Sequence, residues 1–185
     1  MKALNSIFVL VAAFLAVFAE AVISAPRHWL GAQIDLLPAL IVYAALNTNL
    51  VALSILSVFG GLWFDSLSAN PLGLTILPLF VVGFPIFLQR DLILRELPFA
   101  QVVLGGIASA VVPLLAVLLL LTAGQKPLLG WGSLWQWIVM TAGGAVATPV
   151  FFAIFEWCDD ALGYKPRTET SFRPDREILR DRKKM

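Results

Sequence analysis

Few side chains in this sequence could do chemistry. His28 is the only histidine, which leaves no second imidazole for a His-based metal site and argues against a histidine proton relay. Cys158 is the only cysteine, so it cannot form an internal disulfide or a cysteine-based metal site, and we interpret it as a buried, inert thiol. Phosphate-binding loops, nucleophile elbows and zinc-protease motifs do not occur. The sequence therefore predicts no enzyme activity, no cofactor and no metal.

Acidic residues in apolar surroundings are the remaining candidates. They are Glu20, Asp65 and a group made of Glu156, Asp159 and Asp160. An ionised side chain at the centre of a bilayer costs at least ~2.5–3.5 kcal/mol, so a buried acid is by default a functional candidate. Their positions place these residues near the ends of helices, where that cost falls. We predict that interface solvation or a local ion pair is the role of each.

The elements that must position these residues are membrane helices. Of the 185 residues, 59% are hydrophobic and 14% are charged. A soluble domain has roughly 45–50% apolar and roughly 25% charged residues. There is too little polar surface here to cover a globule in water. The sequence therefore predicts an all-α, polytopic integral membrane protein.

The number of spans depends on one long apolar stretch. Residues 36–64 contain no charge and would make a single rod of ~43 Å, whereas a hydrocarbon core is ~30 Å thick. Asn47-Thr48-Asn49 has weak helix propensity, and we interpret it as a tight turn between two short helices. We expect one transmembrane domain, residues 1–160, with six spans at roughly 5–25, 34–46, 50–66, 72–88, 99–123 and 134–157. The first span resembles a secretory signal, but we expect it to stay uncleaved because a multispan domain follows.

The positive-inside rule orients the loops. With six spans and a cytoplasmic N-terminus, all Lys and Arg residues except Arg27 and Lys126 face the cytoplasm. A five-span model with the N-terminus outside fits equally well, since it only exchanges Lys2 for Arg27. In both models the loop 65–71 faces out and the loop 90–96 faces in. We predict a multi-pass protein of the bacterial inner membrane with a cytoplasmic C-terminus.

The basic tail, residues 161–185, allows two interpretations. It is either a solvated topology anchor with a basic end attracted to anionic lipid, or a docking segment for a cytoplasmic partner.

Small residues mark the helix faces that can approach closely, because lipid provides no hydrophobic force between helices. Gly105 and Ser109 lie one helical turn apart in the fifth predicted span, and Gly143 and Gly144 lie in the sixth. We interpret these faces as intramolecular contacts. The alternative is that one of them receives a helix of another protein.

Residues 59–74 resemble the signature of the rod shape-determining protein family MreD. That family shows a Gly-x-x-x-Asp helix end, a short loop of small residues, and a Leu-Gly pair that opens the next helix. Gly61 and Asp65 match the first part, and Leu72 and Gly73 match the last. The resemblance extends over roughly residues 30–160.

The resemblance implies a non-enzymatic membrane scaffold of the bacterial cell-elongation complex, which directs peptidoglycan synthesis and maintains rod shape. The implied partner is an MreC-like bitopic membrane protein, and indirectly the actin-like MreB filament and the rod-type glycosyltransferase and transpeptidase. Membrane lipid is a further partner, and no nucleic acid is expected. The family fold is similar to that of the substrate-binding subunits of energy-coupling-factor vitamin transporters, and such a subunit is the alternative. The scarcity of polar residues within the spans favours the scaffold.

The signature residues are structural or interaction candidates. We expect glycines to permit close helix contact, Asp65 to cap backbone N–H groups of the following turn or the next helix, and Gly73 to relieve crowding where the chain re-enters. The candidates are Gly60, Gly61, Asp65, Leu72 and Gly73.

Overall fold

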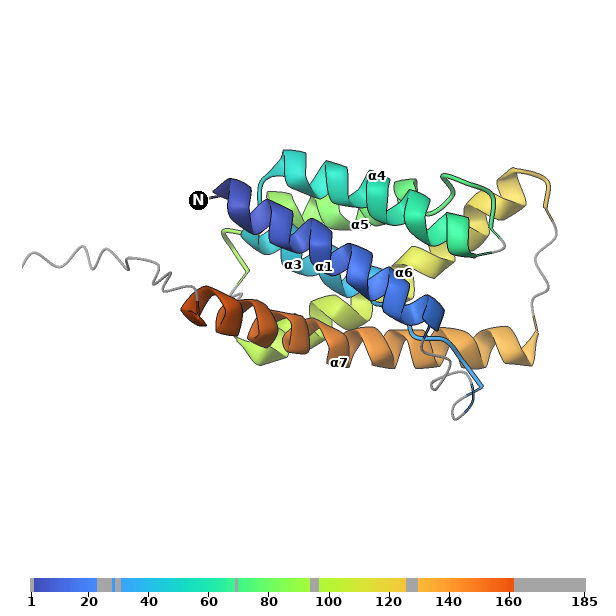
Figure 1. The fold of residues 1–185 in the computed structure, drawn as a ribbon. Coiled ribbons are helices and arrows are strands. Elements are labelled where there is room, and N and C mark those ends of the chain that lie inside the picture. The colour runs from blue at the N-terminus through green and yellow to red at the C-terminus, as the bar shows by residue number, and fades with distance from the viewer. Residues whose placement is uncertain are drawn as a thin grey trace, which may run out of the picture.

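The computed structural model describes residues 2–22, 28, 31–68, 70–93, 97–125 and 130–161. These residues form an all-α bundle, as predicted, in which consecutive helices run in opposite directions (Figure 1). The helices are α1 (Lys2–Val22), α3 (Leu37–Asn47), α4 (Leu50–Leu67), α5 (Ile76–Leu88), α6 (Pro98–Thr122) and α7 (Trp131–Ala161).

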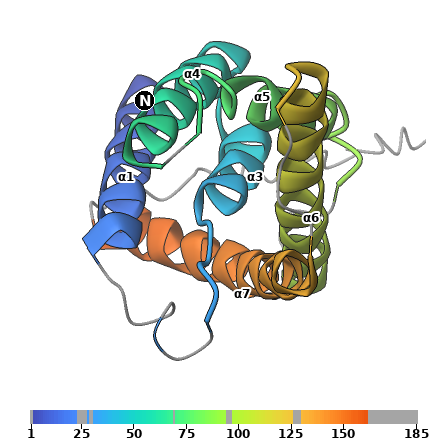
Figure 2. The ribbon, with the colours of Figure 1, turned by 90° about the vertical axis from the view of Figure 1, so that its right-hand side faces the viewer.

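Helix α3 is the centre of the bundle. Seen along the bundle, the other helices form a ring around it (Figure 2). Every residue from Leu37 to Leu46 is buried, so α3 has no lipid-facing side. Tyr43 stacks on Phe155 of α7 with ring centroids 4.2 Å apart, and it meets Phe152 edge to face at 4.9 Å. A helix that is apolar all round belongs in such an interior position.

The turn that separates α3 from α4 is confirmed. Helix α3 ends at Asn47 and α4 begins at Leu50. Thr48 donates its backbone N–H to the Ala44 carbonyl at 2.8 Å, and the Asn49 side chain accepts from the Ala52 N–H at 2.8 Å. The side chain of Asn49 is thus the N-cap of α4, as its residue type favours.

Two helices begin later than predicted. Residues 34–36 lie outside α3, whose first turn contains Pro38. Proline has no N–H and its ring clashes with the carbonyl four residues earlier, so a helix is stable only if it begins close to Pro38. Residues 72–75 form a turn before α5, because Gly73 has a φ of 88°, which is not a helical value. The segments predicted as spans 34–46 and 72–88 therefore each start with non-helical chain.

Three of the described helices are long and apolar enough to cross a membrane: α4, α6 and α7. The described apolar parts of α1, α3 and α5 are shorter, and α3 has only 11 residues. At 1.5 Å per residue, α3 is ~16 Å long, about half of a hydrocarbon core. The chain is thus a membrane protein by the length and composition of these three helices, while the six spans stay a prediction.

Small residues hold α6 against α7, as predicted. A Cβ on Gly105 would lie 2.7 Å from the Gly144 carbonyl oxygen and would also meet the Thr148 side chain. A Cβ on Gly144 would meet the Ser109 side chain. Gly105 and Ser109 of α6 lie one helical turn apart, as do Gly144 and Thr148 of α7. These small residues let the two backbones approach closely. Both helices also contain an internal proline, Pro113 in α6 and Pro149 in α7.

Replacing Gly105 by Ala should destabilise the protein, whereas the same change at Gly106 should be tolerated. A Cβ on Gly106 would lie 3.5 Å from the Ala145 Cβ, which is an ordinary contact. We expect a loss of ~1–3 kcal/mol for Gly105→Ala, the usual cost of overpacking, and less than half of that for Gly106→Ala. Thermal unfolding of the two variants in detergent measures the difference. Equal stability of the two variants would contradict the close α6–α7 contact.

Candidate functional site

The signature residues form a closed corner between the end of α4 and the start of α5. Asp65 is only 1% exposed, although aspartate is an ionisable residue type. One of its oxygens, Oδ2, accepts from the Thr75 N–H at 3.0 Å, and the other, Oδ1, accepts from the Thr75 hydroxyl. Thr75 is the N-cap residue of α5. The carboxylate therefore satisfies a free N–H at the start of the next helix, where the helix dipole also favours negative charge.

These hydrogen bonds agree with the capping predicted for Asp65, and they contradict the prediction of interface solvation or an ion pair for it. Within the described residues, its partners are the backbone and hydroxyl of Thr75. A buried carboxylate that accepts two hydrogen bonds is stabilised without a cation.

The glycines of the corner have two different roles. A Cβ on Gly61 would lie 2.9 Å from the Ile76 backbone nitrogen, so this position requires close contact as predicted. A Cβ on Gly60 would lie 3.1 Å from Leu37 Cδ2, a tight contact with the end of a side chain. Gly73 is different: a Cβ there would lie 3.8 Å from Ile76 Cδ1, an ordinary distance. Its glycine is required by the positive φ of 88°. The prediction that Gly73 relieves crowding was wrong.

Leu72, the fifth candidate, is 71% exposed and lies in the turn before α5. It does not pack into the corner that the other four residues build. Leu72 could therefore take part in binding only through contact with another molecule or with lipid.

A groove lies beside this corner, between α1 and α4. Its volume is 280 Å³ and its wall is almost entirely apolar. Phe14 of α1 meets Trp63 of α4 edge to face with centroids 4.7 Å apart. The remaining lining residues are Leu10, Ala13, Ile55, Leu56, Phe59 and Gly60. The groove therefore combines small residues with large apolar side chains, on the helix that carries the first half of the signature.

A second polar cluster surrounds the non-helical segment 33–36. Glu20 Oε1 accepts from the Leu36 N–H, and Asp35 Oδ1 accepts from the Leu37 N–H at 2.9 Å. Asp35 is 3% exposed, and Glu20 Oε2 is buried without a hydrogen-bond partner among the described residues. Two carboxyl groups thus lie together at the N-terminus of α3, where backbone N–H groups have no helical partner. The prediction of a solvated or ion-paired Glu20 was wrong.

The same segment is fixed from the other side by α7. The Gln33 N–H donates to Gln136 Oε1 at 2.9 Å, and Gln136 Nε2 donates to the Gln33 carbonyl at 2.7 Å. Asp35, Gln33 and Gln136 are the site residues that sequence reasoning missed. A signal existed for Asp35, since an acidic residue shortly before Pro38 is typical of a helix start. No local pattern pairs Gln33 with Gln136, which lie 103 residues apart.

Other predicted features fall elsewhere. Cys158 is free and partly buried, and Glu156 is exposed on α7. Most of the predicted tail, residues 162–185, lies outside the described residues, as does Arg27.

The chain has no match among protein-family models, among curated proteins or among solved structures.

Replacing Asp65 by Leu should destabilise the corner. The change leaves the Thr75 N–H and hydroxyl without their acceptor in a buried position, which costs ~1–3 kcal/mol for each unsatisfied group. Thr75→Val removes only the hydroxyl and should cost less. Thermal unfolding in detergent compares the variants.

The control is Ser66→Ala, which changes an exposed neighbour that hydrogen-bonds only within its own helix, to the Trp63 carbonyl. It should leave the unfolding temperature nearly unchanged. If Asp65→Leu were as stable as Ser66→Ala, the hydrogen bonds to Thr75 would contribute nothing.

Proposed function

We propose that this chain is a non-enzymatic membrane scaffold of the bacterial cell-elongation complex, similar to MreD, that binds an MreC-like bitopic membrane protein. In this proposal the chain holds wall-synthesis proteins together in the inner membrane and so maintains rod shape. The actin-like MreB filament, the rod-type glycosyltransferase and the transpeptidase are its indirect partners. The fold proposed with it is the six-span fold similar to the substrate-binding subunits of energy-coupling-factor transporters.

The observation that carries the proposal is the structural use of the signature residues. Gly61 permits contact with the start of α5, and Asp65 bonds to the N-cap of that helix. Signature residues that fix the relative position of two helices are suited to a protein that binds other proteins through a rigid surface. A catalytic signature would instead direct polar groups into an accessible cavity.

The groove between α1 and α4 is the surface that we assign to the partner's single transmembrane helix. It is continuous with the signature, since Gly60 and Trp63 line it. Phe59 is 64% exposed beside it. In lipid, helices associate through close packing, so an apolar groove with small residues at its base is suited to an apolar helix. This assignment also accounts for a bitopic partner, which has one such helix to offer.

A vitamin-binding subunit is the alternative function. It requires a cavity lined by polar and aromatic residues that opens to the outside. The larger cleft at the divergent ends of α6 and α7 has a volume of 740 Å³, but its lining is mainly apolar. Trp137 of this cleft also uses its indole N–H within the protein, donating to the Ala110 carbonyl at 2.9 Å. The cleft thus supports the vitamin-binding alternative less well than the groove supports the scaffold.

Depletion of the protein separates the two functions. In a rod-shaped host, the scaffold predicts that depleted cells become round and that complementation restores the rods. Cell shape is measured by microscopy, and vitamin uptake is measured in the same cultures with a labelled vitamin. Depleted cells that stay rod-shaped and lose vitamin uptake would show the transport function instead.

Filling the groove should release the partner. Ile55 is 37% exposed and lines the groove, so Ile55→Trp should lower the amount of co-purified MreC-like protein about fivefold, the equivalent of ~1 kcal/mol. Val58 is 40% exposed on the same helix and does not line the groove, and Val58→Trp is the matched control. Equal co-purification with both variants would exclude this groove as the binding surface.

A further inference from the structure

A polar pocket lies at the end of the bundle where α3 turns into α4 and α5 ends. It has a volume of 470 Å³, and polar atoms make up most of its wall. Asn47, Thr48 and Asn49 line it from the turn, and Arg90 and Asp91 line it from the chain after α5. The grooves between α1 and α4 and between α6 and α7 are apolar. This pocket therefore needs a different kind of occupant.

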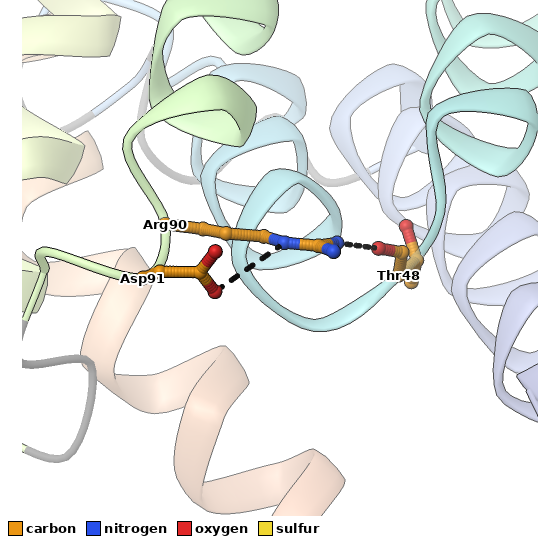
Figure 3. Close-up of polar contacts among 3 residues, drawn as sticks. All are labelled: Thr48, Arg90 and Asp91. Carbon is orange, nitrogen blue, oxygen red and sulfur yellow. Dashed lines mark hydrogen bonds and ion pairs between the residues drawn. The ribbon is translucent and has the colours of Figure 1, made fainter.

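Arg90 lines the pocket and is hydrogen-bonded to the α3–α4 turn. Its Nη1 donates to the Thr48 carbonyl at 3.0 Å (Figure 3). Its guanidinium carbon lies 4.5 Å from the centre of the Phe87 ring. The Asp91 carboxylate is 3.9 Å from Arg90 Nε, and the Asp91 side chain is 93% exposed. An exposed ion pair at this distance contributes little, typically ~0–1 kcal/mol.

Most of the hydrogen-bonding capacity of Arg90 is therefore available. A guanidinium has five N–H donors in a planar fork, and one of them is used by Thr48. The side chain is 38% exposed, so the fork is fixed by the protein and still accessible. A pre-oriented guanidinium with free donors matches the oxygens of a phosphate group, which it binds through two parallel hydrogen bonds.

The position of the pocket relative to the membrane defines the source of that phosphate. Asn49 immediately precedes α4, one of the three helices long and apolar enough to span a membrane. With 18 residues, α4 is ~27 Å long, close to the thickness of a hydrocarbon core. The α3–α4 turn and Arg90 then lie at the boundary between lipid chains and headgroups. Basic pockets at this level bind anionic lipid headgroups.

We propose that this pocket binds the phosphate group of an anionic membrane phospholipid, with the Arg90 guanidinium as its main ligand. The carbonyl of Thr48 and the ring of Phe87 hold the guanidinium in place. The inference is independent of the scaffold function, because it depends only on this end of the bundle and on insertion in a membrane.

Lipid binding to the purified full-length protein tests the proposal. The probes are dioleoylphosphatidylglycerol, dioleoylphosphatidylcholine and inorganic phosphate, added to the protein in detergent and followed by native mass spectrometry. Wild-type protein should bind phosphatidylglycerol about fivefold more tightly than phosphatidylcholine, and Arg90→Gln should remove this difference. Arg95→Gln removes the same charge from the predicted loop 90–96 and is the matched control. This variant should still bind phosphatidylglycerol more tightly than phosphatidylcholine.

A second variant tests the proposal even if Arg90→Gln fails to fold. Asp91→Asn keeps Arg90 and removes the nearby negative charge, so it should raise the affinity for phosphatidylglycerol about twofold. Unchanged or weaker binding by Asp91→Asn overturns the proposal, as does an equal loss with Arg90→Gln and Arg95→Gln. Displacement of the lipid by millimolar inorganic phosphate would overturn the lipid as the source and leave a free phosphate anion as the ligand.

Discussion

The short central helix α3 sets the constraint on which the bundle depends. A backbone in lipid must satisfy each N–H and C=O group within the protein, because no water is present to do so. Helix α3 has 11 residues, and the chain directly before it has no helical hydrogen bonds. Glu20 of α1 and Gln136 of α7 supply the missing partners to Leu36 and Gln33. Buried non-helical chain needs such partners from the protein around it, and here α1 and α7 provide them.

Glycine contacts complete the enclosure of α3. A Cβ on Gly60 of α4 would lie 3.1 Å from Leu37, and one on Gly83 of α5 would lie 2.8 Å from Ile41 Cγ2. A Cβ on Gly143 of α7 would lie 2.6 Å from Ile34 Cγ2, just before α3. At each of these glycines, a helix around α3 lies so close to α3 or to the chain before it that a side chain would crowd its neighbour. Dispersion between closely packed atoms replaces the hydrophobic force that acts in water.

Local patterns in the sequence were sufficient for the all-α architecture, the Asn47–Asn49 turn, the small-residue faces of α6 and α7 and the capping by Asp65. Each depends on residues that are close in sequence or on a property of one helix. The predicted start of α3 at residue 34 is wrong because Pro38 favours a helix start directly next to it. The role of Gly73 was misassigned because backbone conformation, rather than space, requires glycine there. The partners of Glu20 and Gln33 could not be predicted, since a polar residue in an apolar segment indicates that a partner exists but not which helix provides it.

The pairing of Gln33 with Gln136 has a consequence for biogenesis. The two residues are separated by 103 positions, so the second is synthesised long after the first. Until α7 is present, the Gln33 N–H and carbonyl lack the hydrogen bonds that Gln136 provides. The segment before α3 can therefore reach its final hydrogen-bonded arrangement only late, after the last described helix has formed. Truncation before α7 would leave this central segment without the bonds from Gln136, and quality-control proteases would be expected to remove the chain.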